Sequence, residues 1–297
     1  EKPGVGISLG DPTGIGPEIT VKSFADKDLH EIANMLIIGD KLVLQKAIDL
    51  TGYDFKINLC EDPKDAKFKD DTIDLIDLGI IKEDFEYGKV SAKCGKASYE
   101  YVMKTAHLAM DKEIDAMATT PINKESIKAA NINYIGHTEM LEAVSGVKDP
   151  LTMFEVEELR VFFLTRHMSL RDACDAVKYD KIKEYIERCT EAMHRLGMSG
   201  TLAVAGLNPH SGEHGLFGYE EVNEITPAIE DAQKEGYDVV GPIGADSIFH
   251  LALQGEYGAV LSLYHDQGHI ATKTYNFEKT ISITNSMPFL RTSVDHG

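Results

Sequence analysis

Short apolar runs rich in β-branched residues alternate with amphipathic helical patterns along most of this chain. The alternation predicts an α/β fold, because each helix can cover the sheet to which its neighbouring strands belong. The predicted strands are Val5–Leu9, Met35–Ile38, Ile73–Leu78, Ala116–Thr119, Val161–Thr165, Leu202–Leu207, Ala259–Tyr264 and Ile281–Thr284. The predicted helices include Pro17–Phe24, Ala97–Asp111, Lys181–Leu196 and Glu220–Glu235.

The alternation weakens between about Asn123 and Phe162. We expect crossings between two lobes in that stretch and again in the C-terminal third. Residues 1–297 are predicted to form a single two-lobed catalytic unit.

The composition narrows the class of partner. The chain has 297 residues, of which 43% are hydrophobic, and a formal net charge of −19. Such a charge argues against nucleic acid and anionic membrane surfaces, so an anionic substrate requires a local basic pocket. The sequence has no apolar stretch as long as a membrane span and no expected leader, which favours a cytoplasmic location.

Four cysteines are scattered through the chain without CxxC spacing. This pattern disfavours both a disulfide framework and a cysteine-based metal site. We expect them to be small buried hydrophobic residues.

Three histidines each follow an apolar run that is predicted to be a buried strand. They are His167 in Leu164-Thr165-Arg166-His167, His210 in Asn208-Pro209-His210 and His265 in Tyr264-His265-Asp266. Strand ends in an open α/β sheet point into the crevice where ligands bind, and imidazole is a common zinc ligand. Each histidine alone could be an ordinary loop residue, but the three together predict a metal site.

A glycine-rich segment, Gly10-Asp11-Pro12-Thr13-Gly14-Ile15-Gly16-Pro17-Glu18, joins a predicted strand to a predicted helix. It has the place of a phosphate loop but neither the Gly-x-Gly-x-x-Gly spacing nor the Lys-Ser/Thr pair. A tight strand-to-helix turn is an equally good interpretation.

Three further segments carry candidate anion ligands. Thr119-Thr120-Pro121-Ile122-Asn123-Lys124 ends a strand, where Lys124 is either an anion ligand or a solvated lysine at a helix start. Gly136-His137-Thr138-Glu139 has the pattern of a helix start, which can bind phosphate or simply cap the helix. Near the end of the chain, Lys273 and Arg291-Thr292-Ser293 offer basic and hydroxyl groups, although either cation could instead lie on the surface.

These segments together resemble the motifs of the 4-hydroxythreonine-4-phosphate dehydrogenase family of pyridoxal phosphate biosynthesis. The resemblance runs in order along the chain and includes Tyr264-His265-Asp266-Gln267-Gly268 and Arg291-Thr292-Ser293-Val294-Asp295-His296-Gly297. It implies a fold like that of isocitrate and isopropylmalate dehydrogenases, with a cleft between two lobes. It also implies a homodimer with the active site at the subunit interface.

The activity implied is NAD-dependent oxidation of the C3 hydroxyl of a 4-phosphorylated four-carbon acid, followed by decarboxylation. The family pattern requires a divalent metal on His167, His210 and His265, with ligands shared across the dimer. Zinc is expected, with cobalt, manganese or magnesium as alternatives. The implied substrate ligands are His137, Thr138, Lys273, Ser282 and Arg291, and the candidate catalytic groups are Lys273, Asp266 and Asp246. The residues that bind NAD are not identified.

Three features depart from the family pattern. Ser282 stands where the biosynthetic enzymes usually have a substrate-binding Asn, and Arg166 stands where they have a small or hydroxyl residue. Arg166 could bind a substrate anion or point to solvent. The chain ends at His296-Gly297, within a segment that in the family continues to adenosine-side contacts, so incomplete NAD binding is expected.

Two substrate classes remain open from the sequence. One is 4-phosphohydroxythreonine, and the other is the 4-phospho-D-threonate or 4-phospho-D-erythronate of a sister branch. That branch has features similar to Gly215-Leu216-Phe217-Gly218-Tyr219-Glu220-Glu221 and to His269. A metal-dependent phosphoester hydrolase and a non-catalytic phosphometabolite-binding protein are the alternative functions.

Overall fold

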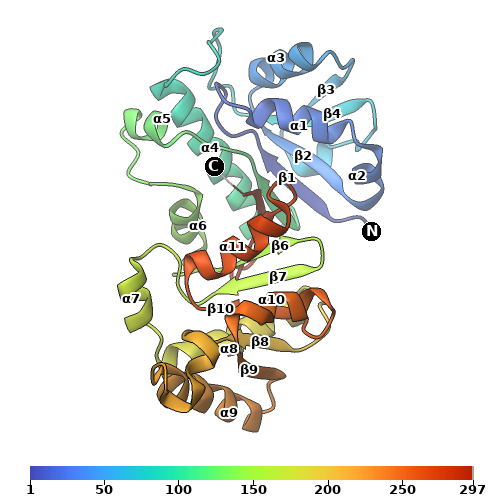
Figure 1. Ribbon diagram of the computed structural model, residues 1–297. Coiled ribbons are helices and arrows are strands. Elements are labelled where there is room, and N and C mark those ends of the chain that lie inside the picture. Colours follow the sequence, from blue (N-terminus) through green and yellow to red (C-terminus); the bar gives the residue numbers. More distant parts are fainter. Residues whose placement is uncertain (296–297) are drawn as a thin grey trace. The chain divides into compact units, whose positions relative to one another are not determined.

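The structure is a computed structural model that describes residues 1–295, and it divides into two compact units (Figure 1). The first unit comprises Glu1–Pro150 together with the segment from Met287 onward, and the second is Leu151–Ser286. Both units are built from a β-sheet and helices, so the predicted α/β class is confirmed.

The first unit contains six strands of the described chain, in the order β3-β4-β2-β1-β5-β12. All the pairings within it are parallel. Their bounds are β1 Gly4–Ser8, β2 Asn34–Gly39, β3 Lys56–Cys60, β4 Thr72–Asp77, β5 Ala116–Thr119 and β12 Leu290–Val294. Because β12 pairs with β5, the end of the chain returns to the sheet of its first half.

The helices of the first unit are α1 Gly16–Phe24, α2 Lys27–Ile32, α3 Lys41–Thr51, α4 Ala92–Met110, α5 Lys124–Ala129 and α6 His137–Ser145, with a 3₁₀ turn at Pro63–Asp65. Helix α4 packs on β1, β2 and β5 and buries Tyr101 completely. It begins five residues before the predicted start, Ala97, because the Ser91 side chain accepts a hydrogen bond from the Cys94 N–H and caps the helix there.

The second unit also contains six strands, in the order β11-β6-β7-β10-β8-β9. Strands β11, β6 and β7 pair antiparallel, whereas β7, β10, β8 and β9 pair parallel. Their bounds are β6 Leu151–Val156, β7 Leu159–Phe163, β8 Leu202–Ala205, β9 Val239–Ile243, β10 Ala259–Ser262 and β11 Ile281–Asn285.

The helices of the second unit are α7 Leu170–Asp175, α8 Tyr179–Arg195, α9 Thr226–Lys234, α10 Ala245–Leu253 and α11 His265–Asn276. A short left-handed turn at Pro209–Gly215 and a π-helical segment at Glu221–Ile225 precede α9. Helix α10 packs on β7, β8 and β10, and α11 packs on β6, β7 and β10.

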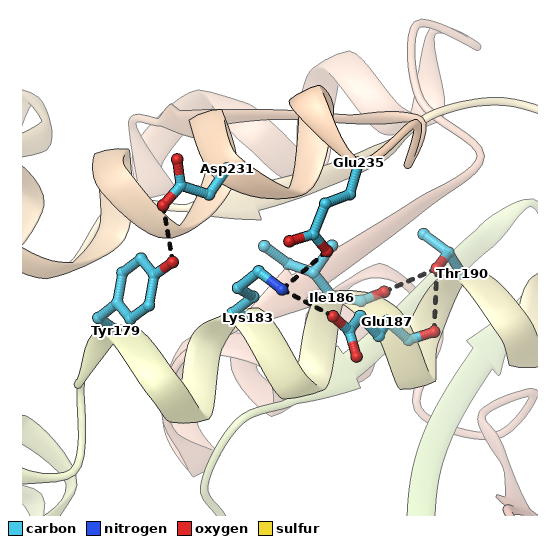
Figure 2. Close-up of polar contacts among 7 residues, drawn as sticks. All are labelled: Tyr179, Lys183, Ile186, Glu187, Thr190, Asp231 and Glu235. Carbon is cyan, nitrogen blue, oxygen red and sulfur yellow. Dashed lines mark hydrogen bonds and ion pairs between the residues drawn. The ribbon is translucent and has the colours of Figure 1, made fainter.

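Helices α8 and α9 lie side by side and are joined by polar contacts on their outer side (Figure 2). The Tyr179 hydroxyl donates to Asp231 at 2.7 Å, and the Lys183 ammonium contacts Glu235 at 2.8 Å. The inward side of α8 buries Ile182, Ile186 and Cys189. The apolar stripe therefore fixes α8 to its neighbours, because exposed ion pairs contribute little.

All eight predicted strands and all four predicted helices are present within a few residues of their predicted bounds. Cys60, Cys94 and Cys189 are buried free thiols, as expected, and Cys174 is half-buried. Among residues 1–295, no helix is both long and apolar enough to span a membrane.

Candidate active site

The three candidate metal ligands follow three neighbouring parallel strands of the second unit, ordered β7-β10-β8. His167 follows β7, His265 begins α11 directly after β10, and His210 follows β8. Each strand ends two residues earlier than predicted, at Phe163, Ser262 and Ala205. The carboxyl ends of parallel strands meet at one edge of a sheet, so all three histidines belong to loops of that edge.

Two of these histidines line one pocket. The ring centroids of His167 and His265 lie 6.0 Å apart, beside a cavity of about 220 Å³ that Arg166 and Tyr264 also line. Nδ1 of His265 lies 2.7 Å from the Asp266 carboxylate. A carboxylate at one ring nitrogen orients the imidazole and leaves Nε2 as the nitrogen available to a ligand.

His210 does not complete a three-residue cluster with them. Within residues 1–295, no group of three or more His, Cys, Asp or Glu side chains lies close enough to hold a metal ion. The donor types fit zinc or a similar first-row metal, but one chain brings together only two of the three imidazoles.

The loop that carries His210 has an unusual backbone. Residues 210–214 all have positive φ angles, including 51° at His210, 53° at Ser211 and 55° at His214. Left-handed backbone costs a non-glycine residue roughly 1–2 kcal/mol. Such a run persists only where the surrounding structure holds it, and it is typical of functional loops.

One side chain connects the ends of two of these strands. The buried Gln267 accepts a hydrogen bond from the Leu263 N–H at 2.8 Å and donates one to the Gly206 carbonyl at 3.0 Å. Next to it, Gly268 packs so tightly that a Cβ would collide with the Phe163 ring and lie 2.6 Å from the Ser262 hydroxyl. Helix α11 therefore starts in close contact with β7 and β10.

Arg166 and His269 lie over two aromatic rings beside this pocket. The Arg166 guanidinium lies 5.1 Å from the Phe154 ring centre and 5.6 Å from that of Phe163. These cation–π contacts hold Arg166 against the protein, and it lines the pocket rather than extending into solvent.

His269 is a buried residue that was identified from the sequence only as a point of resemblance to the sister branch. Its ring stacks on Phe163 and lies 4.2 Å from the His265 ring. Burial, followed by the neighbouring His265 and Arg166, lowers the pKa of His269 to about 3. The ring is thus neutral, and neither of its nitrogens has a hydrogen-bond partner among residues 1–295. Its position beneath His265 could not be predicted from spacing alone.

The other predicted residues of the second unit are more scattered. Ser282 is buried and lies opposite Phe154 in the antiparallel β11–β6 pair, so both side chains share one face of the sheet. Lys273 is half-buried, with its ammonium 5.5 Å from the Phe277 ring. Asp246 is exposed in the first turn of α10, where its carboxylate accepts a hydrogen bond from the Ser247 hydroxyl.

In the first unit, the loop at Gly10–Gly16 is a packed turn. Asp11 is 3% exposed, and its carboxylate accepts hydrogen bonds from the N–H and hydroxyl of Thr13, each at 3.0 Å. Burial raises the pKa of Asp11, and the Thr13 bonds partly oppose this shift. A carboxylate inside the loop is unfavourable for an anion, so the structure supports the turn interpretation.

A second feature of the first unit is the start of helix α6, which was predicted either to bind phosphate or to be a simple cap. Helix α6 begins at His137 after Gly136, as predicted, and its exposed Thr138 lies in the first turn. The Lys124 side chain approaches this helix start, since its Cε would lie 3.7 Å from a Cβ on Gly136. A lysine beside a helix N-terminus favours phosphate or carboxylate.

Arg291 is buried on β12, with 7% of its surface exposed. Its Nε and Nη2 atoms donate to the Thr119 hydroxyl at 3.0 and 2.7 Å. The alternative of a surface cation is therefore wrong. Arg291 pairs with Met117 in the sheet, and its guanidinium reaches Thr119 at the carboxyl end of β5. The motif residues that follow, His296 and Gly297, lie outside the described residues.

Comparison with known proteins decides the family. Residues 31–297 match the family described as Pyridoxal phosphate biosynthetic protein PdxA. The chain belongs to this family. It is 61% identical over 294 residues to "Putative D-threonate 4-phosphate dehydrogenase" of Fusobacterium nucleatum, covering 99% of this chain and 89% of that protein. A protein of the same name from Clostridium botulinum is 57% identical over 298 residues, covering 100% of this chain and 89% of the relative.

The solved structures agree with this membership of the PdxA family. A 4-hydroxythreonine-4-phosphate dehydrogenase from Burkholderia phymatum superposes with a TM-score of 0.91 at 39% identity. The alignment covers 100% of this chain and 91% of the other. The predicted resemblance and fold class are thus confirmed, and the relatives carry dehydrogenase names.

Proposed function

We propose that this PdxA-family protein is a metal- and NAD-dependent dehydrogenase that oxidises and decarboxylates 4-phospho-D-threonate or a closely similar 4-phosphorylated four-carbon hydroxy acid. The two relatives at 61% and 57% identity bear D-threonate 4-phosphate in their names, which favours this substrate over 4-phosphohydroxythreonine. In the proposed reaction, C3 loses a hydride to NAD and its hydroxyl loses a proton to a base, which gives a ketone at C3. The C1 carboxylate then leaves as carbon dioxide, and its bonding electron pair forms an enolate that takes up a proton at C2.

The observation that carries the proposal is the pocket of the second unit, where His167 and His265 lie 6.0 Å apart beside Arg166. Two imidazoles next to a cation suit a metal-bound hydroxy acid whose carboxylate needs a positive partner. A bound metal would supply Lewis acidity at the substrate oxygens. We propose His210 of a second subunit as the third ligand, since the described chain gathers only two.

Asp266 has a supporting role in this proposal. Its bond to Nδ1 of His265 holds the ring with Nε2 directed away from the carboxylate. Lys273 and Asp246 remain proposed catalytic groups, with Lys273 also a substrate ligand.

The substrate's anionic groups would be bound by Arg291, by His137 and Thr138 at the start of α6, and by the neighbouring Lys124. The Gly10–Gly16 loop is not proposed to bind the pyrophosphate of NAD, because Asp11 fills that turn.

The decisive experiment is a spectrophotometric screen of NAD reduction with 4-phospho-D-threonate, 4-phospho-D-erythronate and 4-phosphohydroxythreonine, each with Zn²⁺, Co²⁺, Mn²⁺ or Mg²⁺. We expect NADH formation to be fastest with the threonate and to stop when a chelator is added. Release of inorganic phosphate without NADH would instead identify a phosphoester hydrolase. Substrate affinity without turnover would identify a binding protein.

Ser282 provides a test of substrate choice. We expect the buried serine to favour a C2 hydroxyl over an ammonium, because an Asn at this position would reach further and offer both a donor and an acceptor. Ser282→Asn should shift the ratio of kcat/KM values toward 4-phosphohydroxythreonine by about tenfold, or roughly 1.4 kcal/mol for one exchanged hydrogen bond. An unchanged ratio would remove Ser282 from the determinants of specificity.

A further inference from the structure

The backbone that carries His210 is held from behind by one buried carboxylate. Glu221, the first residue of the π-helical segment, is 2% exposed. Its Oε1 accepts hydrogen bonds from the backbone N–H groups of Leu207 at 2.8 Å and Asn208 at 2.7 Å. Its Oε2 accepts a third from Nδ2 of Asn208 at 2.9 Å. The carboxylate thus fixes the two residues through which the chain enters the left-handed loop.

The middle of the loop is folded against the same carboxylate. A Cβ on Gly212 would lie 2.7 Å from Oε2 of Glu221, and the φ angle of this glycine is 79°. The N–H of Phe217 donates to the Gly212 carbonyl, which closes the loop behind this contact. The chain is therefore wrapped around Glu221, and the left-handed residues are held in a conformation that they would not adopt alone.

His210 is an exposed residue of this loop. Its ring is 6.2 Å from that of Phe217. The hydrogen bonds of the buried carboxylate go to Leu207 and Asn208, so its influence on His210 passes through the chain of the loop. In this arrangement the side chain that holds the backbone, Glu221, is distinct from the proposed metal-binding side chain, His210.

We infer that Glu221 is a positioning residue for His210: it holds the left-handed loop so that the imidazole is presented to the metal. This inference rests on the proposed function, in which His210 is a metal ligand. It concerns the backbone behind the ligand, and it predicts that metal affinity depends on a side chain that touches neither metal nor substrate.

The test compares two adjacent glutamates in the full-length chain. Glu221→Gln keeps the shape of the side chain, but its NH₂ group would face the Asn208 NH₂ group, so one of the three bonds is lost and the charge is removed. Glu220→Gln is the matched control. Within residues 1–295 its carboxylate accepts one hydrogen bond, from Nδ2 of Asn208 at 2.7 Å, and an amide oxygen can replace it.

Zn²⁺ alone, titrated calorimetrically into each apo protein, gives the affinity. We expect Glu221→Gln to weaken Zn²⁺ binding by roughly 10–100-fold, the usual range for outer-shell partners, and Glu220→Gln to change it by less than about threefold. Amide hydrogen exchange in the absence of metal should rise in residues 207–215 of Glu221→Gln and stay unchanged elsewhere. Glu221→Asp, which keeps the charge but shortens the reach, should give the same pattern if the glutamine variant fails to fold.

A His210→Ala arm separates this inference from the proposed function. Loss of Zn²⁺ affinity in His210→Ala with wild-type affinity in Glu221→Gln would overturn the positioning role and leave the proposed metal site intact. Wild-type affinity in His210→Ala would overturn the metal site and, with it, the role of Glu221. A uniform rise in exchange with unchanged affinity would show that Glu221 only stabilises the fold.

Discussion

Two loops of this protein follow a parallel strand, contain proline and glycine, and enclose a carboxylate that is almost fully buried. In the Gly10–Gly16 loop the carboxylate is the loop's own Asp11, which bonds to Thr13 and closes the turn on itself. In the loop at Pro209–Gly215 it comes from Glu221, beyond the loop, and it holds the chain from behind. The first arrangement fills the loop, whereas the second leaves the loop's outer side free to present a ligand.

The largest expected effect is the loss of stability when each of these two carboxylates is removed. Glu221→Ala leaves two partly buried backbone donors without an acceptor, so we expect the free energy of unfolding to fall by about 2–4 kcal/mol, at about 1–2 kcal/mol per donor, the lower part of the range for an unsatisfied buried group. Asp11→Ala orphans only the Thr13 N–H, because the Thr13 hydroxyl still donates to the Lys89 carbonyl, and should cost about 1–3 kcal/mol. Urea denaturation measures both, and a larger loss in Asp11→Ala would reverse the comparison.

The next effect concerns anion binding in the first unit. Replacing Arg291 with Ala should raise KM strongly, by roughly 2–4 kcal/mol of lost transition-state binding, if this buried guanidinium pairs with the substrate. Asp11→Asn should leave KM nearly unchanged, because the Gly10–Gly16 loop is a turn and not a ligand site. Steady-state kinetics of both variants check this contrast. Equal effects on KM would mean that the loop takes part in binding after all.

A smaller effect on stability is expected when one glycine of each loop is replaced by alanine. Gly212→Ala places a Cβ 2.7 Å from Glu221 at a φ angle of 79°, so we expect a loss of roughly 1–2 kcal/mol from the backbone alone. Gly14→Ala meets nothing closer than 3.5 Å and has no positive φ, and it should change stability by less than about 1 kcal/mol in either direction. Thermal unfolding of the two variants measures this difference. A wild-type Tm for Gly212→Ala would mean that the left-handed loop can adjust to the added Cβ without loss of stability.

The smallest effect is a dependence on pH. Burial raises the pKa of Asp11 in the folded protein, so folding favours the protonated form. Its contribution to stability is present at low pH and is lost as the pH rises through the folded pKa. Asn cannot ionise, so the Tm of Asp11→Asn minus that of wild type should increase between about pH 4 and pH 7. A difference that falls over this range would contradict the assigned direction.

The sequence predicted the helices and strands of this fold better than it predicted which strands pair with one another. Strand β5 was predicted with its observed bounds because a short apolar run ends in polar residues at Thr119. Strand β12 was not predicted, because Arg291 and Ser293 interrupt its apolar pattern and its stability comes from pairing with β5, far away in the chain. Pairing over such a distance leaves little trace in local periodicity.

The candidate site was predictable in its residue types and less so in its geometry. Histidines after apolar runs predicted that His167, His210 and His265 converge, and the structure brings His167 and His265 together because they follow the adjacent strands β7 and β10. The left-handed backbone at His210 was not predictable, since a buried group thirteen residues beyond Asn208 imposes it. His269 was not predicted as a neighbour of His265, because only packing against Phe163 places the two rings together.

The hydrogen bonds of Gln267 determine how a displacement of one histidine-bearing loop affects the other. One amide group touches the chain just after β10 and just after β8, so the loops leading to His265 and to His210 take their positions from the same side chain. Because the proposed third ligand of each pocket is His210 of a second subunit, a displacement of that amide would move the His265 loop of one pocket together with the His210 loop that serves the other. The two loops therefore share one anchor, and this amide would connect the two proposed pockets of a dimer.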